Sequence, residues 1–294
     1  MKGVKQFFYN LNMIFCMIFS SSGLWLAAAT AFLLFLISPA TVTQTGATVS
    51  IIQVLVVCVS QKDIANIGFV MPSAVNIIAN AGSQYIATFL PVLAAFPSIP
   101  LLLEMQKSGF GRFAIMRQSK NSYLCSCIIA GWISGGMVML IGYVGMALPV
   151  YLLLPAGDIP PEFFVSNSPL EGLVGILGTG TVIIGQAINQ FFYGAFFALP
   201  ALFLVHRLHN RYLVLCIPVL LRFLYDTLMT RPYREQLQIG NFEKAQWFAN
   251  WFSTSLSTAV TQPNMWVWLW LLGGLGIVLV LNCIFAGFEV DIGG

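Results

Sequence analysis

Arg222 and Asp226 are charged residues that stand well inside an apolar stretch of this chain. Their spacing of four residues places both on one face of a helix, where the two side chains can form an ion pair. A charge at membrane depth is costly and usually faces a partner or a water-filled cavity. The pair is therefore either a structural ion pair near the end of a membrane span or a polar element beside a pathway through the membrane.

Three amides, Gln186, Asn189 and Gln190, give another apolar stretch a polar stripe. Such a stripe can form hydrogen bonds between helices or line a pathway, and the sequence leaves both interpretations open. Glycines in two of the apolar stretches would let helices approach closely. They stand at positions 131, 135 and 136, and at 178, 180 and 185.

No apolar stretch holds the groups that an intramembrane hydrolase or transferase would need, such as a nucleophile with a base or paired carboxylates. His206 and His209 lack a third ligand of suitable type nearby, so we predict no metal site. The phosphate-binding pattern GxxxxGK[ST] does not occur. We therefore expect no enzyme and no cofactor in this chain, and any ATP that it depends on would bind another polypeptide.

Composition assigns the chain to a membrane. Hydrophobic residues make up 58% of the 294 positions and charged residues only 8%, against roughly a quarter charged in soluble domains. The apolar runs are continuous and long enough for membrane helices, whereas closed barrels show short alternating segments. We predict an all-α polytopic membrane protein with a single transmembrane domain and no nucleic-acid partner.

Six spans are predicted from the apolar runs. They cover about 23–39, 84–103, 122–149, 172–204, 212–228 and 266–287. Residues 1–20 are amphipathic and form either an interfacial helix or the lower end of a long first span. The short β-branched segment 51–59 fits a strand, a re-entrant piece or part of an outer subdomain.

Basic residues orient these spans. With both termini in the cytoplasm, the inner intervals are 1–20, 104–121, 205–211 and 288–294, and the outer loops are 40–83, 150–171 and 229–265. The inner intervals hold eight basic residues: Lys2, Lys5, Lys107, Arg112, Arg117, Lys120, Arg207 and Arg211. The longer outer loops hold four: Lys62, Arg231, Arg234 and Lys244. Because cytoplasmic loops carry the excess of Lys and Arg, we predict that both termini are cytoplasmic.

The outer interval 229–265 combines charges with Phe242, Trp247, Phe248, Trp251 and Phe252. These aromatic residues are spaced like one face of a short helix. They predict either a helix that rests at the lipid interface or a lip that contacts a substrate.

The inner interval 104–121 is the most polar and basic stretch between two spans. It contains Glu104, then Gly109 and Gly111, the helix-like segment 113–116, a basic patch at Arg117 and Lys120, and a Tyr-Leu start to the next span. Together with six sequential spans and an amphipathic start, this interval resembles the membrane subunits of type-2 ATP-binding cassette (ABC) exporters.

The resemblance implies that 104–121 is a coupling loop that docks on a separate ATPase subunit. Its predicted docking residues are Glu104, Phe110, Arg112, Phe113, Met116, Arg117 and Lys120. The aromatic and aliphatic residues would present an apolar face, and the charges would set orientation. A basic loop that only follows the positive-inside rule is the other interpretation.

The resemblance also implies a function. Two such chains, or this chain with a related one, would form a pathway in the bacterial cytoplasmic membrane, in contact with lipid. Two ATPase subunits, which bind ATP and magnesium, would drive export of a hydrophobic or amphipathic cargo such as a lipid, an antimicrobial peptide or a drug. The alternative is a membrane accessory or immunity protein that acts by binding and transports nothing.

Overall fold

The structure is a computed structural model of the chain, and it is mostly helical. It describes residues 2–42, 48–60, 73–80, 86–110, 120–155, 178, 180–205, 207–208, 210–245, 247 and 265–286. The helices are α1 Lys2–Ser20, α2 Ser22–Ile37, α3 Ile51–Val59, α4 Ala74–Asn80, α5 Ile86–Ala95, α6 Ile99–Lys107, α8 Lys120–Leu153, α10 Gly180–Leu204, α11 Arg211–Gln238 and α14 Met265–Ala286. A small antiparallel hairpin joins β1 Pro39–Val42 to β2 Thr48–Ser50.

Within the described residues, three helices are long and apolar enough to cross a membrane: Phe89–Lys107, Lys120–Leu153 and Gly180–Leu204. The segments Gln6–Ser20 and Ser22–Ile37 meet at a bend of 59° and add a fourth if they form one broken span. Shorter apolar helices cover Tyr212–Leu224 and Leu272–Asn282, where the fifth and sixth spans are predicted. The structure thus confirms a helical fold suited to a membrane, while the number six remains a prediction.

The structure adds detail to two sequence-based predictions. Segment 51–59 forms helix α3, not a strand, and a capping box between Ser50 and Gln53 starts it. The predicted fifth span, 212–228, is the first part of a 28-residue helix that continues to Gln238. Hydropathy marks where the apolar residues end, but helical hydrogen bonding continues past that point.

Helix α8 lies at the centre of the bundle and packs against α10, α2 and α1. Its 34 residues give a length of about 51 Å at 1.5 Å per residue. Glycines bring the helices together. A Cβ atom at Gly194 of α10 would lie 2.4 Å from the carbonyl oxygen of Gly135 on α8, and one at Gly142 would lie 2.7 Å from Cβ of Ala31 on α2. The predicted close approach at positions 131, 135 and 136 is confirmed, because a Cβ at each would meet α10.

The C-terminal half of α8 contacts both α4 and α2. Tyr143 is fully buried, its hydroxyl donates a hydrogen bond to the carbonyl of Ile78 on α4 (3.3 Å), and its ring meets Phe35 of α2 edge to face. These contacts fix α2, α4 and α8 relative to one another.

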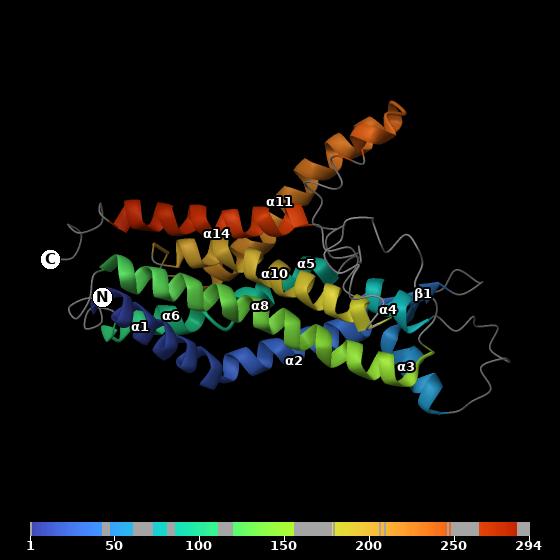
Figure 1. Cartoon of the computed structure of the whole chain (residues 1–294), viewed down its shortest axis with the longest axis horizontal. Helices are drawn as coiled ribbons and strands as arrows, with labels where there is room; N and C mark the ends of the chain where they lie inside the picture. The colour runs from blue at the N-terminus through green and yellow to red at the C-terminus, as the bar shows by residue number, and fades with distance from the viewer. Residues whose placement is uncertain are drawn as a thin grey trace.

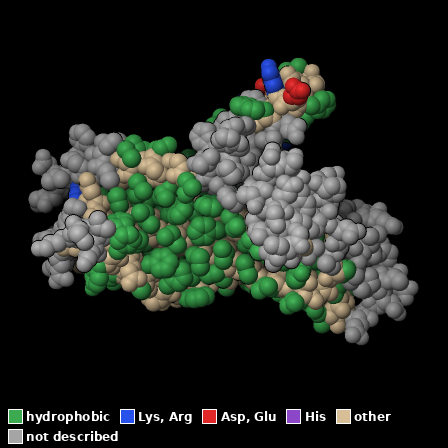
Figure 2. Space-filling view, viewed as in Figure 1, with side chains coloured by type: hydrophobic (Ala, Val, Ile, Leu, Met, Phe, Trp, Pro, Cys, Tyr) green, Lys and Arg blue, Asp and Glu red, His purple; other side chains and the backbone are tan. Residues whose placement is uncertain are grey.

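Figure 1 shows how the helix ends are distributed. The start of α1, the α6–α8 junction, the α10–α11 junction and the end of α14 lie at one end of the molecule. The hairpin, α3, α4, the end of α8 and the start of α10 lie at the other. The second half of α11 leaves the bundle and projects outward, and Figure 2 shows charged side chains at its tip and hydrophobic side chains over the bundle face in view.

Candidate functional site

Arg222 is a charged side chain buried in the bundle, only 3% exposed. It projects from α11 toward α10, where its guanidinium carbon lies 5.4 Å from the ring centre of Tyr193 and 5.3 Å from that of Phe197. These distances suit cation–π contacts, which are strongest where water is excluded. The two rings therefore stabilise the guanidinium of Arg222 in a buried position.

The α10 face that contacts Arg222 is continuous with the predicted polar stripe. Gln186, Gln190, Tyr193 and Phe197 follow one another at intervals of four, three and four residues, so they share one side of the helix. Gln186 and Gln190 are both buried. The structure thus brings the amides of α10 and Arg222 of α11 onto one buried surface, with the aromatic pair between them.

Gln190 is the unusual member of this surface. Its side chain has no exposed area, and within the described part of the chain neither its amide oxygen nor its amide nitrogen has a hydrogen-bond partner. Most buried polar side-chain atoms in proteins do have one. Among the described residues, hydrogen bonding between helices therefore does not account for the amide of Gln190.

Asn189 and Asp226 are the other polar residues predicted for this site. Asn189 is half-buried on α10, to the side of the Gln190 face. Asp226 lies one turn beyond Arg222 on α11, but its side chain falls outside the described part of the structure. The proposed Arg222–Asp226 ion pair therefore stays a prediction.

The predicted coupling loop begins inside helix α6. Glu104 and Lys107 belong to its last turn, and both are exposed. Gly109, at a φ of 73°, follows the helix end, and Phe110 packs half-buried against the core. Lys120 begins α8. The other predicted docking residues, Arg112, Phe113, Met116 and Arg117, lie outside the described residues.

A hydrogen bond joins this region to a second predicted inner interval. The side-chain amide of Gln106 on α6 donates to the carbonyl of Val205 at the end of α10 (3.4 Å). Arg207 follows, with its guanidinium carbon 4.6 Å from the ring centre of Phe203. The described ends of α6 and α10 therefore lie side by side at the same end of the bundle.

Among the described residues, no three His, Cys, Asp or Glu side chains come together as metal ligands would. His206 and His209 lie outside that part of the chain.

Sequence reasoning missed Tyr193 and Phe197 as partners of Arg222. A signal was present, because both continue the spacing of Gln186 and Gln190 along one face of α10. What the spacing does not reveal is which other helix meets that face.

Comparison with known protein families, curated proteins and solved structures finds no match to this chain.

Proposed function

We propose that this chain is the membrane subunit of an ATP-driven exporter of the type-2 ABC class, working with a separate ATPase subunit. The observation that carries the proposal is the α6–α8 junction. Exposed Glu104 and Lys107 lie at its start, and the hydrogen bond from Gln106 to Val205 links it to the α10–α11 junction. A partner that binds here would contact ends of four helices at once, so its movement would reach much of the bundle.

In this proposal the chain crosses the cytoplasmic membrane six times and both termini are inside. Two observations support that orientation. The predicted inner intervals carry eight basic residues against four in the longer outer loops. The described helix ends next to those inner intervals also lie together at one end of the molecule (Figure 1).

The proposed assembly contains two membrane chains, identical or related, and two ATPase subunits that supply the ATP and magnesium sites. A shape change in the ATPases would be transmitted through residues 104–121 as a rigid-body movement of helices. The cargo would be hydrophobic or amphipathic, and the buried surface that Gln186, Gln190 and Arg222 share would meet its polar part.

The docking region is tested by the double substitution Phe113→Asp with Arg117→Glu. We expect it to abolish co-purification of an ATPase subunit while membrane insertion of the chain stays normal. A matched control is Phe242→Asp with Lys244→Glu, which makes the same kinds of change at exposed positions at the opposite end. The control should retain the ATPase.

The measurement is purification of the tagged chain in mild detergent from its native host, with co-eluting proteins identified by mass spectrometry. A stoichiometric subunit bearing a phosphate-binding loop would support the exporter. Recovery of such a subunit by the Phe113→Asp, Arg117→Glu variant would refute the docking assignment. Intact, folded wild-type chain with no ATPase would instead favour the accessory or immunity role.

A further inference from the structure

Helix α11 continues well past its apolar stretch, which covers Tyr212–Leu224. Leu220, Leu224 and Leu228 are exposed at intervals of four residues and form one stripe on its outer side. The next two positions along that stripe are Arg231 and Glu235, both exposed. The stripe suited to lipid chains therefore ends between Leu228 and Arg231, and we expect the edge of the hydrocarbon layer on this helix at the same place.

Beyond this edge the helix becomes amphipathic. Leu228, Pro232, Tyr233 and Leu237 fall on one half of its circumference, which only Gln236 interrupts among the described side chains. The opposite half carries Arg231, Arg234, Glu235 and Gln238. We call residues 228–247 the distal arm, and its helical part, 228–238, is about 16 Å long.

A glycine turn ends the helical part of the distal arm. The backbone N–H of Asn241 donates to the carbonyl of Gln236 (2.9 Å), and that of Gly240 donates to the carbonyl of Leu237 (3.1 Å). With Gly240 at a φ of 78°, this is a Schellman motif. A helical turn, 242–245, follows, and the side-chain oxygen of Asn241 caps it by accepting from the N–H of Lys244 (3.3 Å).

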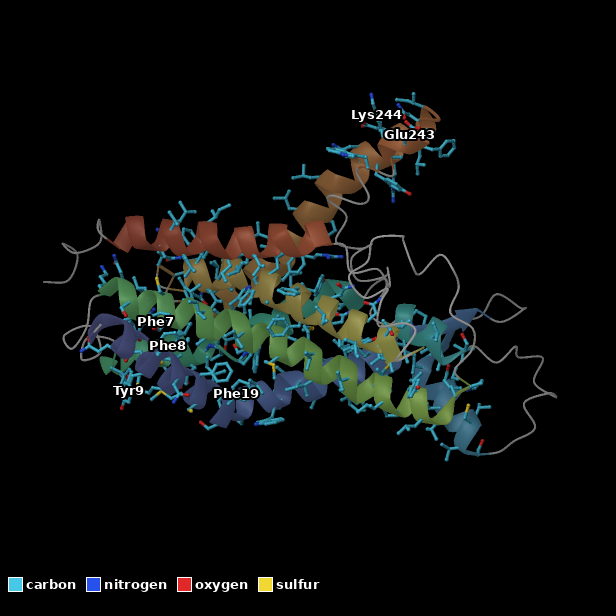
Figure 3. All side chains as sticks on the ribbon, in the orientation of Figure 1. Phe7, Phe8, Tyr9, Phe19, Glu243 and Lys244 are labelled. Carbon is cyan, nitrogen blue, oxygen red and sulfur yellow. The ribbon has the colours of Figure 1, made fainter. Side chains whose placement is uncertain are left out.

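Large apolar side chains at and beyond the turn are exposed. Ile239 is 74% exposed, Phe242 70% and Trp247 50%. Glu243 and Lys244 lie beside them at the tip of the arm (Figure 3). An aromatic and aliphatic face flanked by Arg and Lys is typical of the membrane–water interface.

We propose that the distal arm binds the phospholipid surface of the leaflet opposite the termini. Ile239, Phe242 and Trp247 insert at the boundary between headgroups and acyl chains, while the cations contact lipid phosphates. The lipid surface is the occupant because the arm begins where the exposed leucine stripe of α11 gives way to charged residues, at the expected edge of the hydrocarbon layer. Its three cations, Arg231, Arg234 and Lys244, also outnumber its two carboxylates, Glu235 and Glu243. The assignment does not depend on an ATPase partner.

The proposal is tested by depth measurements on the full chain in nanodiscs of phosphatidylcholine and phosphatidylglycerol. A spin label is attached to a single cysteine at position 237, 242 or 235, with the native cysteines replaced by alanine. Positions 237 and 235 are a matched pair, two residues apart on opposite faces of the same exposed helix. We expect labels at 237 and 242 to collide mainly with oxygen, at a depth of about 5–10 Å, and the label at 235 to collide mainly with an aqueous nickel complex.

Equal aqueous accessibility at all three positions would overturn the proposal. So would a label at 237 that is shielded from both reagents and shows dipolar coupling to a second chain, because that result would make another copy the occupant. As a further check, Arg231→Gln with Arg234→Gln should make the label at 242 shallower, whereas Gln238→Asn should leave its depth unchanged. If Arg231→Gln with Arg234→Gln also leaves the depth at 242 unchanged, these arginines do not hold the arm on the lipid surface.

Discussion

Among the described glycines, an added Cβ at Gly194 would make the shortest contact with backbone between α8 and α10. A Cβ there would lie 2.4 Å from the carbonyl oxygen of Gly135 and 2.5 Å from Cγ of Met139. Such a clash with backbone cannot be relieved by rotating a side chain, so α8 and α10 would have to move apart. Small residues at helix interfaces are the usual device for close packing in membranes, where lipid competes equally for apolar surface.

We therefore predict that Gly194→Ala destabilises the chain by about 1–3 kcal/mol, the usual cost of overpacking. The matched control is Gly276→Ala on α14, where an added Cβ has no atom within 4 Å. That control should be neutral or slightly stabilising, because alanine favours a helix. Thermal unfolding in detergent measures both, and equal melting temperatures for the two variants would contradict the packing described here.

Gln190 lowers the stability of the wild-type protein, because its side-chain amide is buried. Because its buried amide has no hydrogen-bond partner among the described residues, it loses hydration without replacement, at roughly 1–3 kcal/mol. Gln190→Leu keeps a similar volume and removes that cost, so we expect a higher melting temperature. A loss of transport together with this gain would identify Gln190 as a residue kept for function. A lower melting temperature would show that the amide is satisfied in the folded protein.

At the scale of elements, the end of α11 depends on one glycine. Gly240 has a φ of 78°, a conformation that costs a residue with a Cβ roughly 1–2 kcal/mol. We expect Gly240→Ala to open the Schellman turn. Amide hydrogen exchange at positions 240 and 241 should then be faster than in the wild-type protein. Gly240→Asn should have a smaller effect, because asparagine tolerates this region. Exchange rates that do not change in either variant would show that the turn is not closed in solution.

The accuracy of the predicted helix boundaries depends on whether the helix ends where its apolar residues end. Helices α8 and α14 follow their apolar runs closely, because the predicted spans 122–149 and 266–287 correspond to Lys120–Leu153 and Met265–Ala286. Segment 51–59 was ambiguous because its valines suit a strand, and the Ser50–Gln53 capping box was the overlooked helix signal. The length of α11 could not be read from hydropathy, because polar residues continue a helix as well as apolar ones do.

The candidate site was predictable only in part. Gln186, Gln190 and Arg222 stand out in the sequence because polar groups are rare in its apolar stretches. Their assembly depends on α11 packing against α10 with Arg222 facing Tyr193 and Phe197, a tertiary contact with no local signal. The same limit holds for Gly194, whose role follows from Gly135 on another helix.

At the scale of the whole molecule, the arrangement of helix ends leads to a topology prediction. Single cysteines are introduced at Ser108 and at Lys244, which are both exposed. The predicted orientation places position 108 on the cytoplasmic side of the membrane and position 244 on the opposite side. In intact cells, a membrane-impermeant maleimide should label position 244 and leave 108 unlabelled until the membrane is opened. Labelling of both positions in intact cells would place them on the same side and reject the six-span orientation.

The glycine contact between α8 and α10 also restricts which parts of this protein can move. A shift of α10 by one turn would bring Gln190 or Ala198 to the place of Gly194, and neither side chain fits 2.4 Å from a carbonyl oxygen. Helices α8 and α10 therefore keep one register and do not slide past each other. Glycine contacts also hold α2 and α5 against α8, at Gly142 and Gly135. In the proposed exporter, motion that carries cargo would then belong to helices for which no such contact is described, such as α1, α6 and α11.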